Sequence, residues 1–323
     1  MMNLFRNILF LIMFFSLMAF DFVYAEMLLQ GKDFQGANLR GKNLAGANLK
    51  GANLYGASLI GANLSGADLS GADLRHSYLR SAIARGANFT DVNLGKSDLT
   101  LADLRETNFN GSILTLAIFD SARLDGTDFS NAHMAGVSMK KAILNEAILN
   151  NTILLDADLS QAILKRASFK KANLGAKQLG FIGPASARLV GADLHKANFS
   201  GANLKGVNFK EAILTNTLFN KARMGCSNLE WVDANGSDFS GASLTWMLAY
   251  GADFQGASFK GAKLVSAQFV GSNLKGANFQ GSNLTRTNLS QCNLQDTEFE
   301  DSEIDETLFH HAKNIPAGIK KGR

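Results

Sequence analysis

The stretch 201–220, GANLKGVNFKEAILTNTLFN, repeats one short pattern four times. A small residue stands two places before each large apolar residue of the pattern, and these large residues are Leu204, Phe209, Leu214 and Phe219. An α-helix rotates about 140° over five residues, so a helix would spread these side chains over all of its faces. On a straight strand, an odd step would send successive central residues to opposite faces. Only a chain that bends once in every five residues brings all of them to one side.

The same phase extends from Phe34 to Phe309, and 52 of the 56 central positions hold Leu, Phe, Met or Ile. The residue before the centre is often Asn, Asp or Ser, and the residues after it are polar, commonly ending in Gly. The small and the large residue are two apart, so a short extended segment points both inward, while glycine relieves strain at the bend. Backbone groups of one coil then bond to the next coil, about 4.8 Å away. The sequence predicts an all-β solenoid with a core of Leu and Phe.

The spacing of phenylalanines indicates the number of sides. Among central positions, a sequence separation of 20 occurs in seven Phe pairs and a separation of 15 in only two, which favours four pentapeptides per coil over three. A two-sided coil would enclose no core. Four sides predict an aromatic column formed by Phe199, Phe219, Phe239, Phe259, Phe279 and Phe299.

Several runs resemble the A(D/N)LXX signature of the pentapeptide repeat family: Ala37-Asn38-Leu39, Ala47-Asn48-Leu49, Ala62-Asn63-Leu64-Ser65-Gly66 and Ala72-Asp73-Leu74. The resemblance covers about residues 30 to 310. It implies a right-handed quadrilateral parallel β-helix with four repeats to the coil, and the length of the repeat region then corresponds to about 14 coils.

The N-terminal segment 1–25 does not follow the repeat. Arg6 precedes an apolar run from Ile8 to Phe20, and small residues stand at Val23 and Ala25. This pattern predicts a secretory signal over 1–25 and a periplasmic or secreted mature protein. The alternative is an uncleaved anchor in the inner membrane, although the run is shorter than the ~20 residues of a spanning helix.

The remaining chain divides into a β-helix over 26–310 and a C-terminal tail or cap over 311–323. An end of the rod could instead meet a second copy in an end-to-end homodimer, because an uncovered coil exposes a strand edge. The segment 180–184 departs from the consensus and is interpreted as an irregular corner, with a hinge as the alternative. Cys226 and Cys292 lie more than three coils apart, too far for a disulfide, so both are expected to be free thiols.

No set of residues has the spacing of a catalytic, cofactor-binding or metal-binding site, so we expect neither an enzyme nor a cofactor. Residues 160–224 contain eleven Lys or Arg and two acids. With a period of 20, Lys165 and Lys205 would share one corner and Lys170 and Lys210 the next. The candidate basic stripe comprises Lys165, Arg166, Lys170, Lys171, Lys205 and Lys210. It is interpreted either as solubilising charge or as a surface for an acidic protein or anionic lipid.

Trp231, Trp246 and Tyr250 all fall at positions predicted to point outward. Trp246 is expected one coil above Cys226, and Tyr250 one coil above Glu230. Exposed Trp and Tyr residues are typical of interfaces, but they could also simply cover a corner.

These features favour a non-catalytic exported scaffold that binds a protein partner. The alternative is a secreted effector acting at host membranes, supported by the basic stripe. The family resemblance also implies a DNA mimic that protects type II topoisomerases. That role requires a negative surface, whereas this chain carries a net charge of +4. Direct nucleic-acid binding is not expected.

Overall fold

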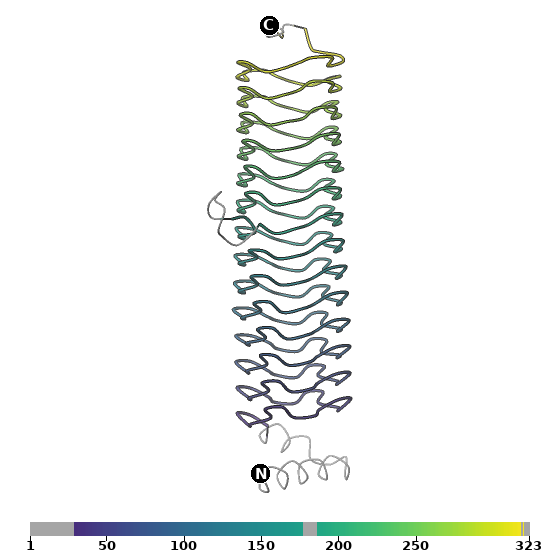
Figure 1. Ribbon diagram of the computed structural model, residues 1–323, viewed down its shortest axis with the longest axis vertical. Coiled ribbons are helices and arrows are strands. Elements are labelled where there is room, and N and C mark those ends of the chain that lie inside the picture. Colours follow the sequence, from purple (N-terminus) through teal and green to yellow (C-terminus); the bar gives the residue numbers. More distant parts are fainter. Residues whose placement is uncertain (1–28, 177–185, 318, 320–323) are drawn as a thin grey trace.

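The computed structural model describes residues 29–176, 186–317 and 319, and these residues form a long stack of coils (Figure 1). In place of long strands, each pentapeptide contributes an isolated parallel β-bridge at the residue before the central one. The described residues contain no helix that is both long and apolar enough to cross a membrane. The predicted signal over 1–25 lies outside the described residues.

Four ladders of β-bridges define four faces of the rod, and most bridges join positions separated by 20. In chain order, the first face runs from Asp33 to Glu303, the second from Asn38 to Leu308, the third from Asn43 to Lys313 and the fourth from Asn48 to Glu298. The two residues after each central residue form a corner. Each corner is named after the face that precedes it, so the fourth corner leads into the first face.

Backbone hydrogen bonds link each coil to its neighbours. The Leu49 N donates to the Asp68 O at 2.7 Å, and the Gly51 N donates to the Ser70 O at 2.9 Å. Within the corner, the Ala52 N donates to the Leu49 O at 3.0 Å. The Asn48 Oδ1 accepts a further bond from the Lys50 N at 3.2 Å, which explains the preference for Asn or Asp before the centre.

The second residue of each corner has a left-handed backbone. Gly251, for example, has a φ of 62°, a conformation that glycine adopts without steric cost. The bend required by the five-residue period is therefore made at this position.

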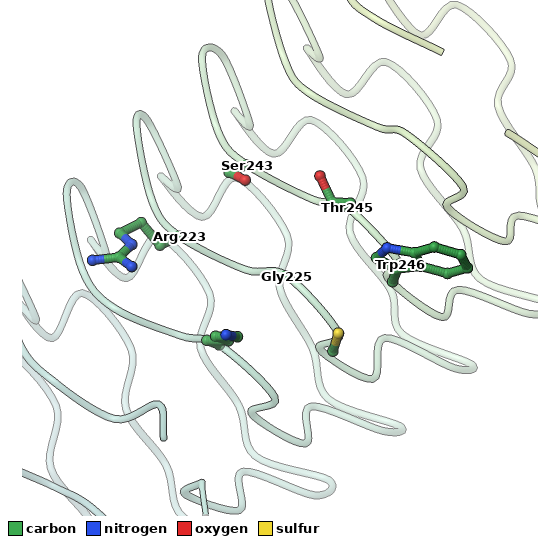
Figure 2. Close-up of a pocket in the computed structure, with 7 residues that line it drawn as sticks. Arg223, Gly225, Ser243, Thr245 and Trp246 are labelled. Atoms are coloured by element: carbon green, nitrogen blue, oxygen red, sulfur yellow. The ribbon is translucent and has the colours of Figure 1, made fainter. Parts of the chain in front are cut away.

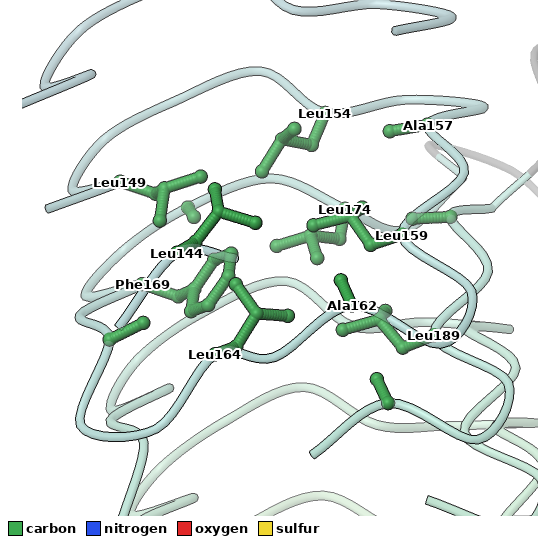
Figure 3. Close-up of a cluster of buried hydrophobic side chains, with 14 of the residues drawn as sticks. Leu144, Leu149, Leu154, Ala157, Leu159, Ala162, Leu164, Phe169, Leu174 and Leu189 are labelled. Carbon is green, nitrogen blue, oxygen red and sulfur yellow. The ribbon is translucent and has the colours of Figure 1, made fainter. Parts of the chain in front are cut away.

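The central and small residues fill the interior, as predicted. Figure 3 shows leucines such as Leu144, Leu164 and Leu174 pointing inward beside Phe169. The predicted aromatic column is confirmed, because neighbouring rings are nearly parallel along its whole length. The centroids of Phe219 and Phe239, for instance, are 4.8 Å apart at 6°.

The ladders contain one discontinuity, which the regular five-residue period does not predict. Asp158 pairs with Arg188, at a sequence separation of 30, and the other faces show the same jump, with Ile163–Asp193, Ser168–Asn198 and Asn173–Asn203. The Ala187 N donates to the Leu174 O at 2.9 Å, a contact made elsewhere by residues three apart. The segment 180–184, expected to be irregular, lies outside the described residues.

The jump equals two pentapeptides, so inward positions stay inward on both sides of this junction. Phe169 consequently stacks on Phe199, with centroids 4.5 Å apart, and extends the aromatic column. Outward positions after the junction lie half a coil away from where a strict period of 20 would place them. At the C-terminal end, Ile315 and Ile319 pack against the last part of the core.

Candidate interaction surface

The junction changes the predicted basic stripe. The Arg166 N donates to the His195 O, so His195 and not Lys205 belongs to the corner of Lys165. Lys205 instead lies against Gly175, where a Cβ would be 2.3 Å from the Lys205 N. The predicted alignment of Lys165 with Lys205 is wrong, because the separation between successive coils rises to 30 at this point.

The predicted alignment of Lys170 with Lys210 is wrong for the same reason. The Lys171 N donates to the Ser200 O, so Ser200 lies next to Lys170 on the fourth corner. The Gly191 N donates to the Lys210 O, which places Lys210 on the second corner. The six predicted bases are therefore distributed over all four corners and form no single stripe.

Three of the predicted bases form ion pairs with neighbouring acidic residues. The Lys165 Nζ lies 3.1 Å from the Asp193 Oδ2, and Arg166 pairs with Glu146 one coil below. The Lys210 Nζ lies 3.8 Å from the Glu230 Oε2. These side chains add little to the attraction of a distant anion, because a neighbouring carboxylate offsets each charge.

The other predicted bases belong to a different surface, the first face with its flanking corners. This basic face comprises Lys170, Lys171, Lys205, Lys221, Arg223, Lys260 and Lys263. Lys205 is half-buried and the others are exposed. Among the described residues, no carboxylate lies within ion-pair distance of any of them. The same face and corners carry no Asp or Glu on the coils from Lys170 to Arg286.

Sequence reasoning missed Lys221, Arg223, Lys260 and Lys263. The departure from consensus at 180–184 is the signal that could have identified them. When two pentapeptides are left out of the coil count there, all seven bases fall on the first face and its flanking corners. The five-residue register does not reveal the two extra pentapeptides, because Leu179 and Pro184 still fall at its central positions.

A groove of about 300 Å³ crosses the basic face at the first corner (Figure 2). Arg223 and Gly225 lie on one coil, and Ser243, Thr245 and Trp246 lie on the next. Lys205 and Cys226 complete the lining. The groove exists because Gly225 has no side chain at a corner position that holds lysine at Lys205 and threonine at Thr245.

The predicted outward aromatics do point outward. Trp231 and Trp246 are each 61% exposed, and Tyr250 is 36% exposed. Trp246 lies on the coil after Cys226, as expected, and both line the groove. Trp231 and Tyr250 occupy the second corner on neighbouring coils, joined by a bond from the Trp231 N to the Tyr250 O.

The three aromatics therefore border the second face from its two sides, with the half-buried Leu248 between them. We call Trp231, Trp246, Tyr250 and Leu248 the aromatic face. It meets the basic face at the first corner, where Trp246 lines the same groove as Lys205 and Arg223.

The cysteines are free, as predicted. Burial raises the pKa of the Cys292 thiol to about 12, so this sulfur stays protonated and unreactive at neutral pH. In the described parts of the chain, no cluster of three or more His, Cys, Asp or Glu residues could hold a metal ion.

One buried acid joins the coils on either side of the junction. The Asp158 Oδ2 accepts a hydrogen bond from the Arg188 Nη2 at 3.0 Å, and the Lys140 Nζ lies 3.5 Å away. Burial acts to raise the pKa of Asp158, but hydrogen bonds from Ser160 and Arg188 outweigh it and hold the pKa below its usual value. Asp158 is therefore charged at neutral pH and contributes to holding the two coils together.

Comparison with protein families identifies the repeat. The profile described as Pentapeptide repeats (8 copies) matches overlapping segments that together cover 29–175, 187–225 and 227–310. The matches stop at the junction, where the ladders also change their period. The comparison with curated proteins found no match.

Solved structures of pentapeptide repeat proteins are also similar to this chain. One is HetL, involved in heterocyst differentiation regulation in the cyanobacterium Nostoc sp. strain PCC 7120, at 27% identity over 69% of this chain and 89% of HetL, with a TM-score of 0.38. Full-length QnrB1, a plasmid-mediated fluoroquinolone resistance protein, is 16% identical over 70% of this chain and 92% of its own, with a TM-score of 0.25. Rfr23 from the cyanobacterium Cyanothece 51142 is 21% identical over 47% of this chain and 90% of its own, with a TM-score of 0.19.

Proposed function

The chain belongs to the pentapeptide repeat family and has the family's right-handed quadrilateral β-helix, and from this premise we propose that it is a non-catalytic exported scaffold that binds another protein. The main observation that supports this proposal is the continuous outward surface formed by the aromatic face and the basic face. A surface of this kind can recognise a partner without a catalytic centre.

The two tryptophans support a binding role on energetic grounds. Trp231 and Trp246 have φ values of 59° and 62°, a backbone conformation that costs a non-glycine residue about 1–2 kcal/mol. Both rings are largely exposed, so little apolar burial offsets this cost. Large aromatic side chains become favourable when a partner covers them, and Trp and Tyr are enriched among the residues that dominate binding energy.

The exported location rests on the pattern of residues 1–25. If these residues act as a secretory signal, the protein isolated from the cell envelope or medium will begin at Glu26. N-terminal sequencing of that material tests the proposal. A retained N-terminus in the membrane fraction would instead favour the inner-membrane anchor.

Cross-linking in the producing cell tests the binding role. We expect the chain to be captured with a defined partner protein, and the triple variant Trp231→Ala, Trp246→Ala, Tyr250→Ala to lose most of that capture. The matched control replaces two exposed residues far from this surface, Tyr78→Ala and Leu101→Ala, which are 51% and 57% exposed. Equal capture by both variants would reject the aromatic face as the contact, and no specific capture by the native chain would reject the scaffold role.

The basic face also favours a second candidate, an effector that acts at anionic host membranes. Sedimentation with vesicles of anionic or neutral lipid distinguishes this role. It requires a preference for anionic vesicles that weakens with salt. The proposal of a DNA mimic that protects type II topoisomerases is less favoured, because a surface resembling DNA would be rich in carboxylates. An absence of effect on gyrase supercoiling is the expected result.

A further inference from the structure

We propose that the basic face binds an acidic segment of the partner protein, lying along the rod axis with one carboxylate side chain in the groove at Gly225. The inference rests on the proposed scaffold function, and it names the chemistry of the segment that the partner presents.

The charge arrangement is the first support. The seven bases span five successive coils, a length of about 20 Å at the usual strand spacing. No carboxylate among the described residues offsets them, whereas Lys165, Arg166 and Lys210 on the other corners are paired. An isolated row of like charges on a rigid sheet repels itself, so an incoming anion gains attraction from several bases at once.

The groove supplies a specific seat within this row. Arg223 presents a guanidinium fork that matches a carboxylate, and Lys205 adds a second positive charge to the groove lining. Ser243 and Thr245 provide hydroxyl groups, and the exposed ring of Trp246 forms an apolar wall. The combination fits a Glu or Asp side chain followed by an apolar residue.

The rest of the first face favours a polypeptide over an anionic membrane. The terminal coil carries a block of acids on this same face and its corners: Glu300, Asp301, Glu303, Asp305 and Glu306. The block begins two coils beyond Lys263, about 10 Å away. A flat anionic bilayer against the basic face would also meet these carboxylates, whereas a protein segment can end before them.

Below Lys170, the first face continues with the half-buried Ile153, then the exposed His133, and then Ile113, which is 46% exposed. A polypeptide can place apolar residues here and acidic residues on the bases. A nucleic acid or an anionic polysaccharide has no matching apolar segment, so these ligands would leave the isoleucines uncovered.

Fluorescence anisotropy with the purified chain tests the inference. The probe is a fluorescein-labelled peptide of about eight alternating Glu and Leu residues, which spans about 26 Å when extended. We expect saturable, salt-sensitive binding, and no comparable binding by the same peptide with Gln in place of Glu. The variant Lys221→Glu, Arg223→Glu, Lys263→Glu should weaken binding by at least about tenfold, because like charge then faces the probe.

The control variant Lys141→Glu, Lys196→Glu, Lys275→Glu changes the net charge equally on the second and third corners and should bind the probe almost as the native chain does. Ser243→Glu places a single acid beside the groove and should also weaken binding, which provides a second reading if the triple variant is unstable. Equal weakening by both triple variants would show net charge alone to be responsible and would overturn the proposal. Tighter binding of anionic vesicles, single-stranded DNA or an anionic polysaccharide than of the probe would also overturn it.

Two further readouts separate this inference from the scaffold role. If the native partner is captured equally by the chain and by the basic-face triple variant, the acidic-segment inference fails while the scaffold proposal stands. Sedimentation velocity of the chain alone tests for self-association through the terminal acids. If the chain self-associates, and if replacing the terminal acids by Gln and Asn abolishes this association, the basic face binds a second copy of the chain. That result would reject an acidic segment of a different protein as the ligand.

Discussion

Replacing Gly251 by alanine should disturb Trp231, a central member of the aromatic face. An added Cβ at position 251 would lie 2.3 Å from the Trp231 Cζ3 and 2.6 Å from its Cε3. Real Cβ atoms are not found this close to carbon, so the indole must move. Because the ring is exposed at the end of its side chain, we expect it to rotate away while the backbone ladder stays intact.

The size of the effect follows from comparison with Gly261. Both glycines have a φ of 62°, but a Cβ at position 261 would meet nothing within 4 Å. Gly261→Ala should therefore cost only the left-handed backbone penalty, about 1–2 kcal/mol. Gly251→Ala should cost about 1 kcal/mol more, because the ring leaves its rotamer and its packing on the corner. In a Trp231→Ala background this extra cost should disappear.

Urea unfolding followed by far-UV circular dichroism gives the free energies of unfolding of the five chains: the native protein, the two glycine variants, Trp231→Ala, and Gly251→Ala in the Trp231→Ala background. Emission of Trp231 in a Trp246→Phe background reports on the ring itself, and it should shift to longer wavelength in Gly251→Ala as the ring becomes more hydrated. Two results would refute the reasoning: equal costs for Gly251→Ala and Gly261→Ala with unchanged emission, or an extra cost that survives the removal of Trp231.

Three further predictions concern the core, the thiols and the junction. Phe239→Ala should destabilise the rod by about 3–5 kcal/mol, since it empties a buried site between two stacked rings; a loss below ~1 kcal/mol in urea unfolding would contradict the packed column. A thiol reagent should modify Cys226 in the native chain and Cys292 only after denaturation, and equal native rates would show that Cys292 is not buried. Asp158→Asn should cost about 1–3 kcal/mol at pH 7, because Arg188 loses its charged partner. Because the pKa of Asp158 is lowered in the folded state, this contribution to stability is present above about pH 4 and is lost as the pH falls through the folded-state pKa. The free energies of unfolding of the variant and the native chain should therefore converge in acid. An equal difference between them at pH 7 and pH 3 would rule out the carboxylate as its source.

The fold could be predicted from the sequence because the five-residue period is a local property. The direction of each side chain depends only on its place within its own pentapeptide, and leucines and phenylalanines such as Leu204 and Phe209 are buried as the pattern requires. The aromatic column followed as well, since Phe199 to Phe299 all lie beyond the junction, where a period of 20 holds.

The composition of the faces could not be predicted in the same way. Which residues share a face depends on the length of chain in every coil, and the five-residue phase is identical with and without the two extra pentapeptides. A strict period of 20 therefore predicts Lys165 and Lys210 in a stripe to which they do not belong, and it does not place Arg223 with the other bases. The aromatics Trp231, Trp246 and Tyr250 were placed correctly relative to their neighbours, because no extra residues lie between them.

The junction between Asp158 and Arg188 shows that the interior and the exterior of this rod are specified by different properties of the sequence. Any whole number of pentapeptides can be gained, lost or excluded from the ladders without turning an inward side chain outward. Each such change nevertheless rotates everything that follows by quarter turns and brings new residues into register. Insertions and deletions within regular secondary structure, which disrupt most folds, can here recombine existing side chains into a new surface while the hydrophobic column remains unaltered.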